Sequence, residues 1–190
     1  VVTSERPVIQ TAFNVPIEAI KEIPRGNALI IKKDGSFKLK VINKQRENKA
    51  CSFERIYFSR GNDKDIYNER LELGKRLVPR ILKAVNQDID NTVLSFIPNT
   101  AEISFYGVVK GLESSLNDQK KKAILALGNA ITPEKVDEIL DKITRVDKIT
   151  WKDVKLRTFI TEDSGRDDLV SHVYDTTHGI VKKDDYLVVV

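Results

Sequence analysis

A short apolar run that leads through a polar loop into an amphipathic helix constrains the fold of this chain most. Residues 92–97 read Thr-Val-Leu-Ser-Phe-Ile, follow a polar turn, and stop at Pro98, a pattern typical of a buried strand. Residues 103–116 then place apolar side chains at helical spacing. A strand, a loop and a helix in this order begin a parallel α/β sheet, so we expect an α/β fold.

The flanking segments predict further elements. Residues 27–33 and 37–42 flank Asp34-Gly35 and predict a β-hairpin. Residues 63–85 carry a helical pattern that Pro79 is expected to end or bend. Further strands are expected at residues 53–58, 123–127, 156–160 and 186–190. A further helix is expected to begin at Thr132-Pro133, and its buried stripe would comprise Val136, Ile139, Leu140 and Ile143.

Composition limits the class of protein. The chain has 190 residues, of which 41% are apolar and 32% charged, as in one globular domain or two small ones. Its apolar runs are all shorter than the roughly 20 residues of a membrane span. A single cysteine excludes an internal disulfide and suits a reducing compartment, and a net charge of +4 is too small and too mixed to indicate nucleic acid. We therefore expect a cytoplasmic protein that binds neither a membrane nor nucleic acid.

The two ends of the chain suggest a piece of a longer protein. The sequence has no methionine, and residues 186–190 form a buried-strand pattern with nothing after it. A parallel strand at this point is expected to continue into a sheet beyond the chain. The expectation is therefore an internal fragment.

Residues 51–60 carry a resemblance to a known family. They read Cys-Ser-Phe-Glu-Arg-Ile-Tyr-Phe-Ser-Arg, and Tyr67-Asn-Glu-Arg follows. This resembles the segment that opens the phosphoribosyltransferase half of amidophosphoribosyltransferases, which usually reads Cys-x-x-Glu-Tyr-x-Tyr-Phe-(Ala/Ser)-Arg. The resemblance is strong at residues 51–60 and 157–160, moderate at 1–42 and poor across 114–153.

The resemblance implies a fold, a domain order and a function. It implies a partial type I phosphoribosyltransferase sheet with flanking helices at residues 46–190. A β-hairpin remnant of an αββα N-terminal-nucleophile glutaminase domain would precede it at residues 1–45. The parent would make 5-phosphoribosylamine from phosphoribosyl pyrophosphate and glutamine, with Mg²⁺, in the first committed step of purine synthesis. Both sets of catalytic residues would lie outside this chain, which would be inactive alone. A homo-oligomer and purine nucleotide inhibitors are further expectations.

Candidate substrate-binding residues lie in two segments. Asn99 and Thr100 come between a strand and a helix, where ligands bind in open α/β sheets and where backbone N–H groups suit an anion. An ordinary capped helix start would have the same sequence, but the resemblance implies a loop that contacts pyrophosphate and metal. Arg157 and Thr158 match the Arg-Thr-Phe-Ile of the family, which implies a place near a phosphate; an exposed arginine in a surface ion pair is the alternative.

Two residues of the matching segment have alternative roles. In some family members a cysteine at the position of Cys51 is one of four iron–sulfur ligands; a small core residue is the alternative. Tyr57 matches a tyrosine at the junction where ammonia passes between the two active sites, and the alternative is a core aromatic with a satisfied hydroxyl.

Departures from the family pattern support a second interpretation. Asn99 and Ala101 stand where the family usually has an acid and a serine, and residues 161–168 are acidic where the family has a basic loop. These changes suit a catalytically retired phosphoribosyltransferase-like protein that acts as a ligand sensor or an assembly partner.

Overall fold

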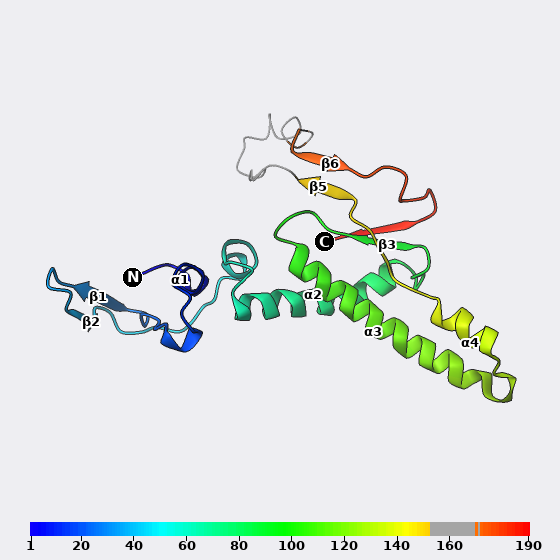
Figure 1. Ribbon diagram of the computed structural model, residues 1–190, viewed down its shortest axis with the longest axis horizontal. Coiled ribbons are helices and arrows are strands. Elements are labelled where there is room, and N and C mark those ends of the chain that lie inside the picture. Colours follow the sequence, from blue (N-terminus) through cyan, green and yellow to red (C-terminus); the bar gives the residue numbers. More distant parts are fainter. Residues whose placement is uncertain (153–169, 171) are drawn as a thin grey trace. The chain divides into compact units, whose positions relative to one another are not determined.

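The computed structural model describes residues 1–152, 170 and 172–190 (Figure 1). The chain divides into two compact units, Val1–Ile66 and Tyr67–Val190, and the division falls within helix α2 (Lys64–Ala84). The domain boundary expected at residue 45 stays a prediction. In the described part of the chain, no helix combines the length and the apolar character that crossing a membrane needs.

The first unit consists of short elements. Its hairpin confirms the strands predicted around Asp34-Gly35. The turn is closed by Asp34, whose Oδ1 accepts a hydrogen bond from the Ser36 N–H at 2.9 Å, while Gly35 adopts a positive φ of 83°. The elements in chain order are α1 (Arg6–Phe13), the 3-10 turn η1 (Ile17–Ala19), β1 (Asn27–Ile31), β2 (Phe37–Val41) and the π-helical turn η2 (Glu54–Phe58).

One face of the hairpin is apolar and open. The antiparallel register sets Leu29 opposite Leu39 and Ile31 opposite Phe37, so these four side chains share a face. Phe37 is 75% exposed, so the described residues leave this face largely uncovered. A two-stranded hairpin is marginally stable by itself, and the first unit builds little core around it.

The strand predicted at residues 53–58 is wrong. Instead η2 forms a π-helical turn that ends where the Ser59 N–H donates to the Glu54 carbonyl at 2.8 Å. The turn stacks Phe53 on Tyr57 with ring centroids 5.4 Å apart and brings the ring centroid of Phe58 to 5.3 Å from that of Phe53. Side chains four and five residues apart meet on a helical turn but not along a strand, which explains how this aromatic-rich segment turns instead of extending.

The second unit is a mixed α/β structure, which confirms the α/β class predicted from the sequence. A three-stranded parallel sheet has the order β4-β3-β7, and β5 and β6 form a separate antiparallel pair (Figure 1). The elements are α2, β3 (Thr92–Ser95), α3 (Glu102–Leu127), η3 (Gly128–Ala130), α4 (Pro133–Leu140), β4 (Arg145–Val146), β5 (Thr150–Lys152), β6 (Tyr174–Thr176) and β7 (Tyr186–Val189).

The core of the second unit lies between the sheet and helices α2 and α3. All four residues of β3 are buried, and Leu94 is fully inaccessible to solvent. Helices α2 and α3 cross closely at two glycines, where no side chain would fit. A Cβ added at Gly107 would lie 2.0 Å from the Leu71 carbonyl oxygen, and a Cβ added at Gly74 would lie 1.8 Å from the Ser104 carbonyl oxygen. The crossing fixes the start of α3 relative to β3. The buried cluster comprises Val78, Leu82, Ile89, Leu94, Phe105, Val108, Leu112 and Leu116.

Two expectations in this unit are wrong, and Pro79 does not end α2, which was one of its two expected effects. Residues 123–127 continue α3 and form no strand, because alanine and leucine are strong helix formers and no breaker separates them from the preceding turns. Pro79 lies inside α2 without ending it; it is on the exposed side of the helix, while Val78 and Leu82 on the other side pack into the core.

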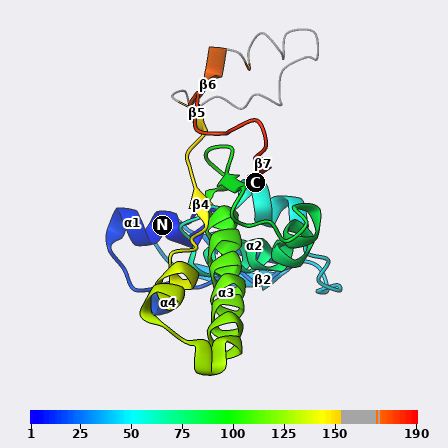
Figure 2. The same cartoon turned by 90° about the vertical axis from the view of Figure 1, so that its right-hand side faces the viewer.

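Helix α4 begins as predicted, with the Thr132 hydroxyl accepting from the Lys135 N–H at 3.4 Å. The helix returns alongside α3 (Figure 2), and the Lys120 Nζ donates to the Leu140 carbonyl at 2.7 Å. The buried stripe expected on it is wrong, because Leu140 and Ile143 are 50% and 69% exposed.

Candidate functional site

The carboxyl ends of β3 and β7 form a topological switch point. From β3 the chain goes to β4 on one side and later reaches β7 on the other side of β3. The backbone pairing continues past both strands: the Val190 N–H donates to the Ser95 carbonyl at 3.1 Å, and the Ile97 N–H donates to the Val190 carbonyl at 2.9 Å. In open α/β sheets, ligands bind in the crevice outside strand ends at such a point.

The loop at residues 96–101 leaves β3 at this switch point. Its base is anchored, since Phe96 packs on Phe105 of α3 with ring centroids 4.9 Å apart and Pro98 is buried. Its tip is open, with Asn99 and Thr100 both exposed. The peptide bond between Pro98 and Asn99 is cis. The sequence predicted that these two polar residues follow a strand and precede a helix, and this position along the chain is confirmed.

The beginning of α3 adds hydrogen-bonding groups to the loop. The Phe105 N–H donates to the Ala101 carbonyl at 2.9 Å, which closes the first helical turn, and earlier N–H groups of a helix start suit an anion. The Glu102 carboxylate accepts a hydrogen bond from the Tyr106 hydroxyl at 2.9 Å, and this contact raises the pKa of Tyr106. The loop thus offers an amide, a hydroxyl and backbone N–H groups, which can bind and orient a ligand but include no nucleophile with an adjacent base.

The described residues do not by themselves supply a metal centre. They bring together no group of three His, Cys, Asp or Glu side chains that could hold a metal ion. Magnesium in phosphoryl sites is often held by substrate phosphates with one or two protein oxygens, and Asn99 and Thr100 could offer only neutral ones here. An iron–sulfur cluster needs four ligands, and Cys51 is the one cysteine of the sequence. No catalytic step is therefore assigned to a metal in this part of the chain.

Arg157 and Thr158, predicted to lie near a phosphate, fall outside the described residues, as do the strand expected at 156–160 and the acidic segment 161–168. Their placement near the loop at residues 96–101 stays a prediction.

Cys51 and Tyr57 lie in the first unit. Cys51 is exposed, so the interpretation as a small core residue is wrong. Tyr57 is half-buried, and its ring contacts those of Phe53 and Phe58, which are themselves 58% and 50% exposed. Tyr57 therefore belongs to a half-exposed aromatic cluster on η2, and its role stays a prediction.

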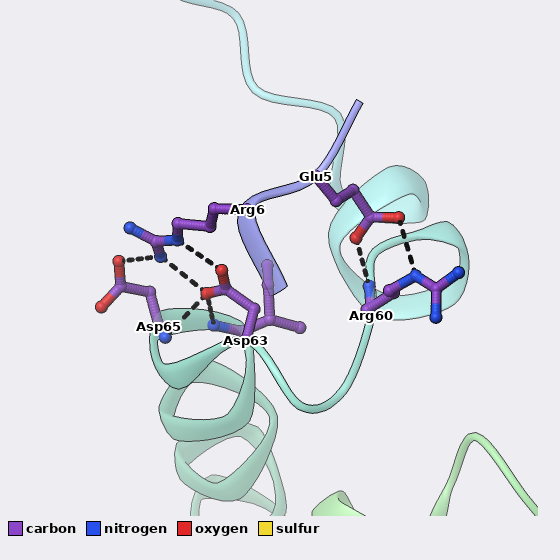
Figure 3. Close-up of polar contacts among 6 residues, drawn as sticks. Glu5, Arg6, Arg60, Asp63 and Asp65 are labelled. Carbon is purple, nitrogen blue, oxygen red and sulfur yellow. Dashed lines mark hydrogen bonds and ion pairs between the residues drawn. The ribbon is translucent and has the colours of Figure 1, made fainter. Parts of the chain in front are cut away.

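A polar cluster at the start of α2 was not predicted from the sequence. Figure 3 shows Glu5 and Arg6 reaching Arg60, Asp63 and Asp65. The Arg6 guanidinium donates to both carboxylate oxygens of Asp63, with the Nη2–Oδ1 distance at 2.7 Å, and also to Asp65. Glu5 Oε2 accepts from the Arg60 N–H at 2.7 Å. Five residues from two distant parts of the sequence thus form two neighbouring polar sets, one around Arg6 and one around Glu5.

Asp63 is the centre of this cluster. Its side chain is only 8% exposed, and Oδ1 also accepts from the Asp65 and Ile66 N–H groups at 2.9 and 3.3 Å, which caps α2. The Arg6 guanidinium, helped by these backbone donors, lowers the pKa of Asp63 to about 2. The position of an aspartate just before a predicted helix could have indicated the cap, but nothing in the sequence pointed to Arg6, which lies 57 positions away.

Comparison with models of protein families and with curated proteins finds no match for this chain. Only the site itself and the resemblance of short segments therefore indicate a function.

Proposed function

We propose that this chain is the part of an amidophosphoribosyltransferase that joins its glutaminase domain to its phosphoribosyltransferase domain. The observation that carries the proposal is the loop at residues 96–101, which opens from the buried strand β3 at a switch point of a parallel sheet. Ligands with phosphate groups bind at such points in α/β folds because backbone N–H groups converge there. The Arg-Thr-Phe-Ile and Cys-Ser-Phe-Glu segments support this choice among α/β enzymes.

In this proposal the loop binds the pyrophosphate of phosphoribosyl pyrophosphate. Asn99 donates from its amide, Thr100 from its hydroxyl, and the first N–H groups of α3 complete the set. Arg157 and Thr158 would contact a phosphate of the same ligand. A guanidinium pairs with phosphate oxygens through two parallel hydrogen bonds, which orients the ligand as well as holding it.

The reaction would transfer nitrogen to the ribose. Glutamine hydrolysis releases ammonia, whose lone pair attacks the anomeric carbon; the C–N bond forms as the C–O bond to pyrophosphate breaks. Pyrophosphate leaves with the bonding electrons, and the nitrogen loses a proton. Magnesium would neutralise the leaving charge. The residues named here would contribute by positioning the substrate and by hydrogen-bonding the developing charge.

Binding of phosphoribosyl pyrophosphate tests the proposal directly. Titration into the ¹⁵N-labelled chain with Mg²⁺ should shift the amide resonances of residues 96, 97 and 99–102. Thr100→Val should weaken the binding about tenfold, the effect of losing one hydrogen bond to a charged group. Thr11→Val, which removes the same hydroxyl from an exposed position of α1, is the matched control. Shifts spread over the whole surface, or equal effects of the two variants, would refute the proposed site.

The second candidate is a retired, phosphoribosyltransferase-like sensor. Asn99 and Ala101 favour it, because an amide and a methyl group replace the acid and the hydroxyl that the family places beside its metal. A sensor would bind phosphoribosyl pyrophosphate or a purine nucleotide at the same loop without turning it over. Binding and turnover measured on the same protein therefore separate the two candidates.

A further inference from the structure

The open end of the β1–β2 hairpin carries a polar cavity that the proposed function does not use. Its volume is about 830 Å³, and its two walls are residues 25–26, which precede β1, and residues 43–47, which follow β2. We propose that this cavity binds the phosphate chain of a linear polyphosphate. The inference does not rest on the proposed function, because the cavity lies wholly within the first unit and its residues take no part in that reaction.

Backbone hydrogen bonds fix the two walls of the cavity to each other. The register of the hairpin begins with Asn27 opposite Val41. Beyond that pair, the Gly26 carbonyl accepts from the N–H groups of Ile42 and Asn43 at 2.8 and 3.0 Å. Gly26 has a positive φ of 73°, and a Cβ added to it would lie 2.4 Å from the Asn43 carbonyl oxygen. Glycine is therefore required at the point where the walls meet.

The side chains that line the cavity are mainly cationic. Arg25, Lys44 and Arg46 contribute three positive charges and Glu47 contributes one negative charge, which leaves a charge of +2. Within the part of the chain that the structure describes, no hydrogen bond or ion pair holds any of these four side chains. The lining therefore presents positive charge to the cavity that no described carboxylate pairs with, and such a concave site attracts anions.

The two arginines of the cavity differ from the other arginines of the first unit. Arg6 and Arg60 each pair with a carboxylate, and Arg55 also interacts with another residue. The guanidinium groups of Arg25 and Arg46 have no such partner among the described residues. Because one comes from each wall, an anion between the walls can accept from both, and a guanidinium offers two parallel hydrogen bonds to a phosphate group.

The size and polarity of the cavity select the class of anion. Its volume is in the range of small-molecule sites, but its lining contains no aliphatic or aromatic side chain, so an apolar ligand would gain little there. The backbone N–H groups of residues 44–47 donate to no other described residue and add donors along one wall. A linear polyphosphate places several phosphate groups in a row, and each can accept from a cation or an N–H group. An inorganic polyphosphate and the triphosphate of a nucleotide share this chemistry.

The test is a titration of sodium tripolyphosphate into the ¹⁵N-labelled chain at low ionic strength without added metal ion. The amide resonances of residues 25–26 and 43–47 should shift together and give one dissociation constant. Inorganic phosphate, which offers a single phosphate group, should bind at least about tenfold more weakly at the same resonances. Equal affinity for the two anions would overturn the assignment to a phosphate chain.

Three substitutions change the charge in predictable directions. Lys44→Gln should weaken tripolyphosphate binding about fivefold, the effect of losing one hydrogen bond between charged groups. Lys40→Gln is the matched control, since it removes the same charge from an exposed position of β2 outside the cavity, and it should change the affinity less than about twofold. Glu47→Gln should tighten binding about threefold, because it removes the negative charge of the lining. All three positions are exposed, so the substitutions leave the fold intact.

Further outcomes decide the source of the ligand and the fate of the proposal. ATP that binds as tightly as tripolyphosphate would support recognition of the phosphate chain alone, and tighter binding of ATP would support a nucleotide as the ligand. Tighter binding of a tetraglutamate peptide would overturn the proposal in favour of an acidic peptide. No shift with tripolyphosphate, or equal losses in Lys44→Gln and Lys40→Gln, would overturn the site.

The same titration separates this cavity from the loop at residues 96–101. Thr100→Val should leave the shifts of residues 25–26 and 43–47 unchanged, because Thr100 belongs to the other unit. A failure of the cavity therefore leaves the proposed function standing, and a failure of the loop leaves the cavity standing.

Discussion

The two units of this chain are held in different ways. In the second unit, β3 is buried along its whole length, and helices α2 and α3 cover it with leucine, valine and phenylalanine side chains. In the first unit, the largest apolar side chains of the hairpin are exposed, and the best-defined long-range contacts are those that Glu5 and Arg6 make with residues 60–65. Apolar burial stabilises the second unit, whereas charged hydrogen bonds organise much of the first.

This difference indicates what each unit can support. A rigid core lets the loop at residues 96–101 present Asn99 and Thr100 from a fixed base, which suits a binding site. A unit organised by a few polar contacts can open locally at low cost. Six substitutions in four experiments test this comparison, in order of decreasing effect.

The largest expected effect is loss of a core side chain from the second unit. Leu94→Ala should lower the free energy of unfolding by about 3 kcal/mol, because the cavity is closed on all sides. Leu39→Ala in the hairpin should change it by less than about 1 kcal/mol, because Leu39 is 51% exposed. Urea unfolding followed by the fluorescence of Trp151, in the second unit, measures the first value, and circular dichroism measures both. Similar losses for the two variants would remove the contrast between the units.

The next effect comes from the close helix crossing. Gly107→Ala should destabilise the second unit by about 2 kcal/mol, since the new methyl group would meet the Leu71 carbonyl and force α2 and α3 apart. Gly111→Ala should cost less, because its methyl group would meet the Val78 side chain instead of backbone and because alanine favours a helix. Thermal unfolding of the two variants gives the comparison; a less stable Gly111→Ala protein would contradict it.

The third effect is pH-dependent and belongs to the first unit. The pKa of Asp63 is about 2 in the folded chain and near its ordinary value of 3.8 when unfolded. The ionised carboxylate therefore contributes stability above pH 4, on the order of 2 kcal/mol, and this contribution disappears as the pH falls through 2.

Asp63→Asn should remove that contribution. Hydrogen exchange of the Ile66 amide, which donates to Asp63, should be faster in Asp63→Asn than in the unmodified chain at pH 5.5. The unfolding free energies of the two proteins should converge near pH 2. A difference that persists at pH 2 would show that the ion pair with Arg6 is not its source.

The smallest effect is expected from an exposed ion pair. Glu72 accepts from Arg76 at 3.1 Å on the surface of α2, and both side chains are more than half exposed. Glu72→Gln should change stability by less than about 0.5 kcal/mol, because solvent screens such pairs. A loss as large as that of Asp63→Asn, measured by thermal unfolding at pH 7, would mean that burial does not distinguish the Arg6–Asp63 ion pair from ordinary surface charges.

The elements with strong local signals were predictable from the sequence. The hairpin at Asp34-Gly35, the strand at residues 92–97 and the start of α4 at Thr132-Pro133 each have a turn or cap residue that fixes the chain locally. The strand signal at residues 92–97 also placed Asn99 and Thr100 between a strand and a helix, and this position along the chain is confirmed.

The errors have physical causes. Residues 53–58 alternate in a way that suits a strand, but their aromatic rings meet at helical spacing, and tertiary context decides between the two. Residues 123–127 form a short apolar run, which periodicity alone cannot assign to a strand or a helix. The contacts of Glu5 and Arg6 could not be predicted because they depend on residues brought together by the fold across more than 50 positions.

The measurement that tests the central claim most directly is phosphoribosylamine formation by the full-length parent, with phosphoribosyl pyrophosphate and Mg²⁺, first with glutamine and then with ammonia. The proposed function predicts turnover with both nitrogen donors, and with it that Asn99 and Ala101 are tolerated in an active enzyme. Turnover with ammonia alone would indicate a lost glutaminase activity. Binding of phosphoribosyl pyrophosphate without turnover from either donor would contradict the enzyme proposal and leave the sensor in its place.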